Sequence, residues 1–263
     1  MATDPVASRS VLVTGGGRGI GAAASLACAA RGWAVGVNYA RDGGAAERVV
    51  AAIRAAGGTA LAVQADVAER AQVAAMFERL DRDLPPLAGL VNNAGVVDLP
   101  GRVEAMTAER LQRMFAINVF GSFFCAGEAV RRMTTRPADG ARFGAGNHRG
   151  GAIVNLSSAA ARLGAPGQYV DYAAAKGAID TFTVGLAKEV ATEGIRVNAV
   201  RPGIIATEIH ASGGAPDRAA QMAPLVPVQR AGSAEEVAEA IVWLLGEGSS
   251  YTTGAVVDVT GGR

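Results

Sequence analysis

Short apolar runs alternate with longer alanine-rich stretches along nearly the whole chain, and this alternation constrains the fold more than any other feature. The apolar runs predict strands at 11–14, 34–39, 60–65, 87–92, 152–157, 195–200 and 255–260. Between them, patterns typical of helices span 19–31, 43–56, 69–82, 107–133, 168–191 and 233–246. A repeat of this kind requires parallel pairing with crossovers, and strands without polar alternation are covered by helices on both faces. The sequence therefore predicts a doubly wound α/β sheet.

Length and composition favour one globular domain over 10–263, preceded by a disordered tail at 1–9. The chain has 263 residues, 50% of them apolar, and its 25 basic and 24 acidic side chains give no bias toward nucleic acid or anionic membranes. No apolar run approaches the ~18 residues of a membrane-spanning helix, and the first residues lack the apolar stretch of a secretory signal. We therefore expect a cytoplasmic protein with neither a membrane nor a nucleic-acid partner.

Two segments interrupt the alternation of strands and helices. Residues 134–150 have no periodicity and predict a long solvated loop, in which His148 is a surface residue with no metal-binding pattern around it. Residues 204–232 combine prolines and glycines with a short amphipathic piece, so this segment is a candidate to close over a ligand. Neither segment indicates a metal site.

Tyr172 and Lys176 lie four residues apart in the alanine-rich stretch DYAAAKGAIDTF, which favours a helix. At this spacing both side chains occupy one face, so the phenol and the ammonium become neighbours. A phenol has a pKa of ~10, and a nearby cation lowers that pKa by favouring the phenolate. Such a proton donor and acceptor suits redox chemistry at a carbonyl or an alcohol. A tyrosine on an alanine-rich helix is nevertheless more often a packing residue.

A glycine-rich turn joins the first predicted strand to the first helix in SVLVTGGGRGIGAAASL. Bare glycines at such a turn let a diphosphate approach backbone N–H groups at the positive end of a helix. The glycines at 15, 19 and 21 have the spacing G-x-x-x-G-x-G, which departs from the usual dinucleotide fingerprint and alone also fits a purely structural turn. The next five strand ends carry polar residues or glycine as well. In a parallel sheet these ends meet at the crevice where ligands bind.

The ordered motifs resemble those of the short-chain dehydrogenase/reductase family, and the resemblance extends from Val11 to Arg263. The motifs are TGGGRGIG at 14–21, Asp66-Val67, NNAG at 92–95, Asn118 in INVFG, Ser158 in NLSS, Tyr172-x-x-x-Lys176 and Pro202-Gly203. Each is modest, but together and in this order they are highly specific. The resemblance implies a Rossmann-like sheet in the order 3-2-1-4-5-6-7, a nicotinamide cofactor, a small-molecule carbonyl or alcohol substrate and commonly a homotetramer.

The same resemblance implies a division of catalytic roles among four residues. Tyr172 would be the general acid/base at the substrate oxygen, and Lys176 would hold the nicotinamide ribose and lower the phenol's pKa. Ser158 would hydrogen-bond the substrate oxygen, and Asn118 would anchor a water-mediated proton relay. In relatives the serine precedes the tyrosine by thirteen residues, whereas Ser158 precedes Tyr172 by fourteen. An extra residue in the intervening loop explains this difference, and Ser157 is the alternative.

The resemblance also implies a larger set of residues that bind the cofactor. Asp66 would contact the adenine amino group, and Ile205 and Thr207 would meet the nicotinamide amide. The full set is Gly15, Gly17, Arg18, Gly19, Ile20, Asn38, Tyr39, Arg41, Asp66, Val67, Asn93, Ala94, Gly95, Tyr172, Lys176, Pro202, Gly203, Ile205 and Thr207.

Charge at the end of the second predicted strand favours NADP(H) over NAD(H). An acidic residue there would bind the free ribose hydroxyls of NAD, but the chain has Asn38, Tyr39 and Arg41. Arg18 adds a second guanidinium, and arginine pairs well with phosphate. Asp42 follows directly and offsets part of that attraction, so NAD(H) stays open.

Two functions remain after the sequence analysis. The first is an NAD(P)(H)-dependent oxidoreductase that interconverts a carbonyl and a secondary alcohol. The alternative is a non-catalytic dinucleotide-binding protein that senses redox state or regulates a partner. The set of Asn118, Ser158, Tyr172 and Lys176 favours the enzyme, because a sensor has no need of all four. The substrate is not decided by the sequence, although parts of it resemble glucose 1-dehydrogenases and 3-oxoacyl reductases.

Overall fold

The computed structural model describes residues 9–136, 150–208, 214 and 217–263. Seven parallel strands form one sheet in the order β3-β2-β1-β4-β5-β6-β7, which confirms the predicted fold and strand order. The strands are β1 (Ser10–Val13), β2 (Ala34–Tyr39), β3 (Ala60–Gln64), β4 (Leu87–Asn92), β5 (Gly151–Leu156), β6 (Ile195–Pro202) and β7 (Val256–Val259). The strand order reverses at β1, which pairs with β2 on one side and β4 on the other. A crevice is expected at the carboxyl ends of these strands.

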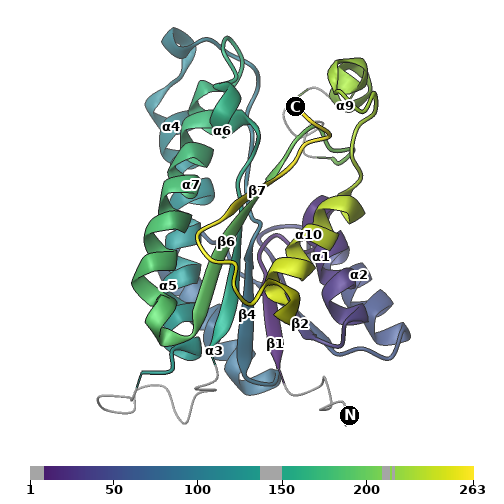
Figure 1. Cartoon of the computed structure of the whole chain (residues 1–263), viewed down its shortest axis with the longest axis vertical. Coiled ribbons are helices and arrows are strands. Elements are labelled where there is room, and N and C mark those ends of the chain that lie inside the picture. Colours follow the sequence, from purple (N-terminus) through teal and green to yellow (C-terminus); the bar gives the residue numbers. More distant parts are fainter. Residues whose placement is uncertain (1–8, 137–149, 209–213, 215–216) are drawn as a thin grey trace.

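Helices cover both faces of the sheet, with α1, α2 and α10 on one side and α3, α4, α5 and α7 on the other (Figure 1). The α-helices are α1 (Gly19–Ala30), α2 (Gly43–Ala55), α3 (Arg70–Asp83), α4 (Ala108–Phe115), α5 (Gly121–Met133), α6 (Ala160–Leu163), α7 (Val170–Val190), α9 (Arg218–Met222) and α10 (Ala234–Leu245). The shorter turns are η2 (Val103–Ala105), η3 (Ala116–Phe120), η4 (Ala191–Glu193), η5 (Ala223–Leu225) and η6 (Glu247–Ser249).

The core consists of one apolar layer on each face of the sheet. In β1, Val11 and Val13 pack with the layer under α1 and α10, whereas Leu12 packs with the layer under α3 and α5. Successive strand residues point to opposite faces, so both faces of a central strand are buried and its sequence is continuously apolar. Burial of each large apolar side chain contributes roughly 1.5–3 kcal/mol. This packing fixes the strand ends that carry the polar motifs.

Two helix starts show how local sequence sets the element boundaries. Ser233 caps α10 by accepting a hydrogen bond from Glu236 N, and the Glu236 carboxylate accepts one from Ser233 N at 2.9 Å. This reciprocal capping box confirms the predicted helix start. Asp42 caps α2 in a similar way, because its Oδ1 accepts from Ala45 N at 2.9 Å.

The predicted helix over 107–133 is divided in the structure. Between α4 and α5, the segment Ala116–Phe120 adopts a π-helix with the wider i→i+5 pattern. The helical sequence pattern continues through the segment, so nothing local marks the change. The short helices α6 and α9 were also not predicted, because four or five residues show too little periodicity.

Several expectations fall on residues outside the described ranges. They are most of the predicted tail at 1–9 and most of the loop at 134–150, including His148, together with part of the segment 204–232. Cys28 and Cys125 are both free and buried, and burial raises the pKa of each thiol to about 12. Within the described residues, no helix is long and apolar enough to cross a bilayer. The same residues form no cluster of three side chains suited to a metal ion.

Candidate active site

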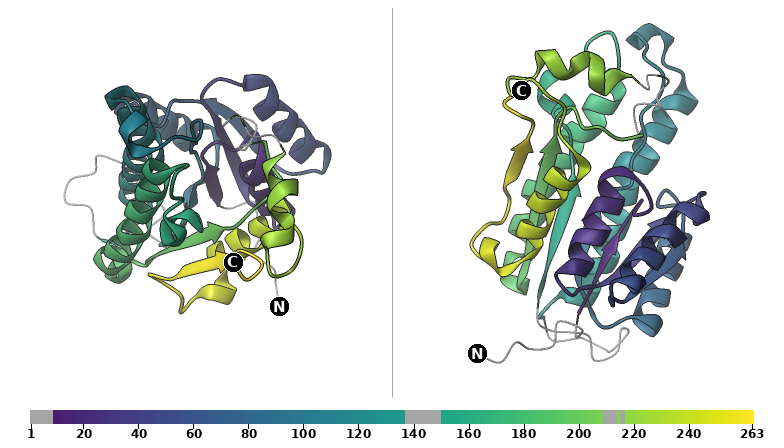
Figure 2. Two further views of the ribbon diagram at one scale, coloured as in Figure 1. Left: turned by 90° about the horizontal axis from the view of Figure 1, so that it is seen from above. Right: turned by 90° about the vertical axis from the view of Figure 1, so that its right-hand side faces the viewer.

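A cavity of about 480 Å³ opens at the carboxyl edge of the sheet, where β5 and β6 end. Ser158, Tyr172 and Lys176 line it together with Gly95, Pro202 and Gly203, so residues from distant motifs meet at one place. The helix α9 and the residue Arg263 lie beside the same edge (Figure 2). The volume falls in the range of small-molecule sites.

Tyr172 and Lys176 lie in the first two turns of α7, as the sequence predicts. The Lys176 side chain is 4% exposed, and its Nζ donates a hydrogen bond to the Leu156 carbonyl at 2.7 Å. The same Nζ lies 5.6 Å from the centroid of the Tyr172 ring. The helix therefore holds the ammonium near the phenol, while the end of β5 fixes its direction.

The expected effect of Lys176 on the phenol is not found. Burial raises the pKa of Tyr172 above its ordinary value, and hydrogen bonding with Ser158 opposes that rise. Burial also lowers the pKa of Lys176 to about 8, while the nearby Asp180 carboxylate raises it. The correction has a physical reason: loss of hydration on burial acts on each charged form separately, and an attraction to Lys176 is not among the causes of the change at Tyr172. The phenol stays protonated at neutral pH.

The two candidate serines point in different directions. Ser157 is 3% exposed, and its hydroxyl donates to the backbone carbonyl of Lys176 at 3.2 Å, which ties β5 to α7. Ser158 is half-buried, and its Oγ accepts a hydrogen bond from Ala160 N at 3.1 Å. It lies close enough to Tyr172 to lower the phenol's pKa. The geometry therefore favours Ser158 over Ser157 as the residue that faces a substrate.

Asn118 lies in the π-helical segment and is completely buried. Its Nδ2 donates to the carbonyls of Val96 and Met114, each at 3.0 Å, and its Oδ1 accepts from Val96 N at 3.2 Å. A Cβ added at Gly95 would lie 2.7 Å from Asn118 Oδ1 and 3.5 Å from Lys176 Nζ. The amide thus links the loop after β4 to the neighbourhood of the lysine. Such π-bulges are frequent at functional sites.

The glycine turn after β1 is shaped by close backbone contacts. Gly15 and Gly19 have φ of 61° and 51°, a conformation that residues with side chains rarely adopt. A Cβ at Gly21 would lie 2.2 Å from the Gly15 carbonyl oxygen, and one at Gly19 would lie 3.3 Å from Thr207. Thr14 joins the turn to the loop after β4, because its Oγ1 accepts from Asn93 N and Ala94 N. Its glycines present backbone N–H groups without side chains of their own, so the turn fits the expected cofactor.

The end of β2 differs from the expectation at one residue. Asn38 is 1% exposed, and its side chain bonds only backbone, accepting from Gly15 N and donating to Ala65 O. It positions the glycine turn rather than presenting its amide to the crevice. Arg18 and Arg41 are exposed, and Tyr39 is half-buried.

The remaining predicted cofactor residues surround the same edge of the sheet. Asp66 is half-buried and accepts from Ala68 N at 3.0 Å, and Val67 is buried against Gly121. Asn93 donates to the carbonyls of Thr14 and Gly15. The cavity lining includes Ile20, Asn93, Gly95, Pro202, Gly203, Ile205 and Thr207. Gly17 packs against the backbone of Ala46, and Ala94 lies beside Gly15.

Comparisons with known proteins agree with this geometry. A family model described as enoyl-(acyl carrier protein) reductase matches residues 15–263. The uncharacterized oxidoreductase YgfF of Escherichia coli K12 is 53% identical over 252 residues, covering 96% of this chain and 98% of that protein. A mutant short-chain dehydrogenase/reductase from Serratia marcescens has a TM-score of 0.87 at 34% identity, covering 98% of this chain and 99% of that one. The chain belongs to the short-chain dehydrogenase/reductase family.

This short-chain dehydrogenase/reductase is therefore an oxidoreductase with a nicotinamide dinucleotide site. A second similar structure, a blue fluorescent protein from a metagenomic library in complex with NADPH, is 31% identical with a TM-score of 0.86. That match covers 98% of this chain and 99% of that one.

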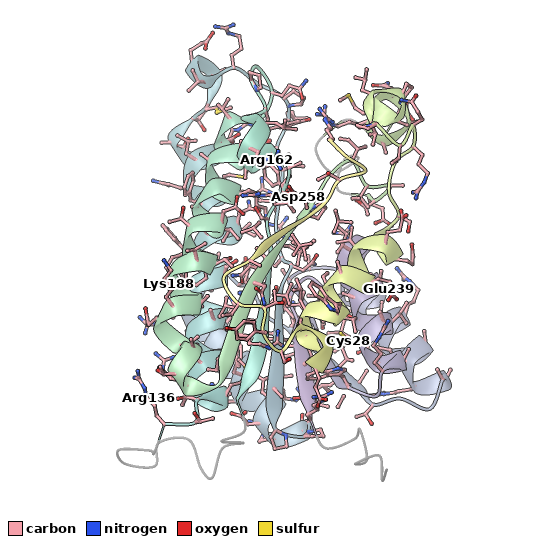
Figure 3. All side chains as sticks on the ribbon, viewed as in Figure 1. Cys28, Arg136, Arg162, Lys188, Glu239 and Asp258 are labelled. Atoms are coloured by element: carbon pink, nitrogen blue, oxygen red, sulfur yellow. The ribbon has the colours of Figure 1, made fainter. Side chains whose placement is uncertain are left out.

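A chain of alternating charges connects the surface of this short-chain dehydrogenase/reductase to Lys176. Arg162 of α6 and Asp258 of β7 point toward one another and form an ion pair (Figure 3). Asp258 also contacts Arg201 at 3.5 Å, and Arg201 Nη2 contacts Asp180 Oδ2 at 2.8 Å. Asp180 follows Lys176 by one turn of α7 and raises its pKa. The ammonium is therefore influenced by a carboxylate that is itself held by an arginine.

The cavity contains residues that sequence reasoning missed. Gln168, Arg218, Met222 and Arg263 line it, and none belongs to a motif. Tyr169, directly before α7, lines the cavity as well. Thr14, which joins the glycine turn to the loop after β4, was signalled only as the first residue of the TGGGRGIG motif. Arg218 had no signal beyond its position in the segment 204–232.

Proposed function

We propose that this protein reduces a carbonyl compound to a secondary alcohol, or catalyses the reverse reaction, with NADP(H) and Tyr172 as general acid/base. The observation that carries the proposal is the meeting of Ser158, Tyr172 and Lys176 in one cavity that continues to Gly95 and Gly203. A hydroxyl, a phenol and an ammonium around one space provide oxygen binding and proton transfer together.

Each residue has a task that follows from its position. Ser158 would donate a hydrogen bond to the substrate oxygen, and Tyr172 would give that oxygen its proton. Lys176, fixed by the Leu156 carbonyl, would bind the ribose hydroxyls and stabilise negative charge near the phenol. The reduced nicotinamide, when bound, supplies the hydride to the carbonyl carbon. Asn118 would hold a water for proton resupply through the loop after β4.

Burial favours the reductive direction at neutral pH. Because burial raises the pKa of Tyr172, the phenol carries the proton that reduction requires. Alcohol oxidation requires the phenolate instead, so its rate is expected to increase with pH.

Charge around the end of β2 supports NADP(H) as the preferred cofactor. Arg18 and Arg41 are exposed beside the glycine turn and are available to a 2′-phosphate. The Asp42 carboxylate, which has the same charge sign as that phosphate, accepts a hydrogen bond from Ala45 N as the cap of α2. NAD(H) remains the alternative cofactor.

The test of the proposed reaction is turnover followed by NADPH absorbance on a panel of ketones, quinones, 3-oxoacyl thioesters and sugars. Replacement of Tyr172 by Phe removes the hydroxyl and should lower kcat by about 10²–10⁴-fold. NADPH binding, measured by fluorescence titration, should change little in this variant. Equal turnover by wild type and Tyr172→Phe would overturn the assignment. Absence of turnover across the panel with intact NADPH binding would favour the redox-sensor alternative.

We further propose a homotetramer. Leu111, Phe120, Phe123 and Val184 are exposed large apolar side chains on α4, η3, α5 and α7. Trp243 of α10, the helix on the other side of the sheet (Figure 1), and Tyr251 are also exposed. Two separate self-complementary faces would give two-fold pairing about two axes. Light scattering that shows a monomer at micromolar concentration would contradict this proposal. The cytoplasmic location stays a prediction, which cell fractionation would check.

A further inference from the structure

The side chains that form the wall of the cavity have a net positive charge. The ionisable residues with a charge at neutral pH that line it are Lys176, Arg218 and Arg263. No Asp or Glu is among the described residues of this lining. Lys176 belongs to the proposed catalytic set, so the two arginines have no task in the reaction.

Arg218 is held in a defined position at this wall. Its Nη2 donates to Gln168 Oε1 at 2.8 Å, and its Cζ lies 5.3 Å from the centroid of the Tyr169 ring. Both contacting residues also line the cavity. An amide oxygen and an aromatic face orient a guanidinium without neutralising it. The guanidinium is half-buried, so it is only partly hydrated.

Two other partly buried arginines of the chain are paired with carboxylates, whereas Arg196 donates to backbone carbonyls and to Ser249. Arg110 binds Asp171 at 2.7 Å, and Arg201 binds Asp180 at 2.8 Å. Arg218 has no acidic partner among the described residues. The stretch 209–216, part of which lies outside the described ranges, contains no Asp or Glu. A positioned cation without a counter-ion in a ligand cavity favours an anion supplied by the ligand.

We propose that Arg218 binds an anionic group, a carboxylate or a phosphate, on the carbonyl substrate. This proposal rests on the proposed function and defines the substrate class of the same site. Tyr169, which contacts Arg218, and Tyr172, which protonates the carbonyl, line the same cavity. The anionic group and the carbonyl are therefore expected on one molecule that fills this cavity.

The experiment compares charged and neutral substrates that share one carbonyl environment. One pair is 4-oxopentanoate and its methyl ester, and the other is hydroxyacetone phosphate and hydroxyacetone. The enzymes are wild type, Arg218→Gln, Arg218→Lys and the control Arg82→Gln, which changes an exposed arginine of α3. Both kcat and KM are measured by NADPH absorbance. Binding of the same four compounds to the NADP-loaded proteins is measured by calorimetry.

We expect wild type to prefer the anion of at least one pair. Arg218→Gln should raise KM for that anion by about tenfold or more and leave its neutral partner within about twofold. Arg218→Lys should restore part of the affinity, and Arg82→Gln should behave as wild type. For the wild-type enzyme, added salt should raise KM for the anion and not for the neutral compound. The substrate pair in which Arg218→Gln affects the anion alone shows whether the site binds a carboxylate or a phosphate.

Equal use of anion and neutral partner in both pairs by wild type would overturn the anion site and leave the proposed function standing. An equal effect of Arg218→Gln on both members of a pair would also overturn it. If no compound is turned over, calorimetry decides the anion site by itself. In that case, anion binding weakened by Arg218→Gln supports the site, and unchanged or absent binding overturns it. Failure on the larger substrate panel is the separate result that would contradict the proposed function.

Discussion

The carboxyl edge of the sheet has two halves that use different chemistry. Around β1, β2 and β3, the crevice is formed by backbone and by the uncharged side chains of Thr14 and Asn38, whose partners are backbone groups. Around β5, β6 and α7, it is formed by buried ionisable groups, above all Tyr172 and Lys176. The first half depends on the absence of side chains, and the second depends on the protonation of side chains that are present.

This difference predicts different consequences of mutation. In the first half, steric overlap limits which substitutions are tolerated, because the turn after β1 leaves no room for an added carbon. In the second half, shape can be preserved while function is lost, because a charge or a proton is the active feature. The variants below test the division, beginning with the largest expected effect.

Replacement of Lys176 by Met should have the largest effect on turnover. The methionine retains an unbranched apolar chain but lacks the ammonium that the Leu156 carbonyl orients at 2.7 Å. We expect kcat to fall by about 10²–10⁴-fold, the range for loss of a group that supports proton transfer. The control is Lys188→Met on the exposed side of the same helix, which should retain wild-type kcat. A modest loss in Lys176→Met, similar to the control, would show that charge does not dominate this half.

Replacement of Gly21 by Ala should damage the other half by steric overlap. The new Cβ would lie 2.2 Å from the Gly15 carbonyl oxygen and 2.5 Å from Asn93 Nδ2, so the turn must move. Overpacking of this kind costs about 1–3 kcal/mol in the free energy of unfolding. NADPH affinity should fall with it by about tenfold or more, because 1.4 kcal/mol corresponds to a factor of ten. Denaturant unfolding and fluorescence titration measure the two effects.

The matched control for Gly21→Ala is Gly185→Ala in the middle of α7. No atom lies within 4 Å of a Cβ built there, so the substitution meets no obstacle. An alanine in a helix interior should stabilise the protein by about 0.5–1 kcal/mol. Equal and small effects at both glycines would contradict the steric account of the cofactor half.

Charge enters the cofactor half only at its surface, and Arg41→Gln tests its contribution. Loss of one charge-assisted hydrogen bond to a 2′-phosphate costs about 1.5–3 kcal/mol, or about tenfold or more in affinity. We expect the ratio of kcat/KM for NADPH to that for NADH to fall by about tenfold, with NADH values unchanged. Arg82→Gln serves as the control. An unchanged ratio would leave NAD(H) as an equal alternative.

Replacement of Asp180 by Asn should have the smallest effect, a displacement of a pH profile. Lys176 has a pKa lowered to about 8, so kcat/KM for NADPH should decline as pH rises above that value and the ammonium loses its proton. Asp180 raises this pKa, so its neutralisation should move the decline to lower pH. Arg201 would keep its longer contact with Asp258 but lose the one with Asp180, so its positive charge near Lys176 would be less compensated and would act in the same direction. Glu189→Gln on the exposed face of α7 is the control, and an identical profile in Asp180→Asn would contradict this coupling.

The doubly wound parallel sheet could be predicted because it depends on patterns that repeat along the whole chain, whereas its strand order followed from the family resemblance. The capping box at Ser233 could be predicted for a similar reason, since both of its partners lie within four residues. The π-helical turn at Asn118 could not be predicted, because Asn118 bonds Val96, which lies in the loop after β4. The residues next to Asn118 in the sequence do not indicate this distant partner.

The structure brings three of the predicted site residues, Ser158, Tyr172 and Lys176, into one cavity, but their electrostatics were predicted less well. Four-residue spacing places Lys176 beside Tyr172 but says nothing about how deeply either is buried, and burial sets the direction of both pKa changes. The sequence also could not show that the Asn38 side chain forms its hydrogen bonds with backbone groups. Arg218 was missed because its importance arises from a long-range contact with Gln168, fifty residues earlier in the chain.

The helix α7 carries both lysines of the sequence, and every other basic side chain apart from histidine is an arginine. Lys188 is exposed, whereas Lys176 is 4% exposed, and the two are separated along the helix axis by about 18 Å. An amine-selective reagent would therefore attach a dye or a solid support at Lys188 and at the α-amino group, and would spare the cavity. The arrangement makes the protein suitable for oriented immobilisation, and slow labelling of Lys176 would report how often the cavity opens.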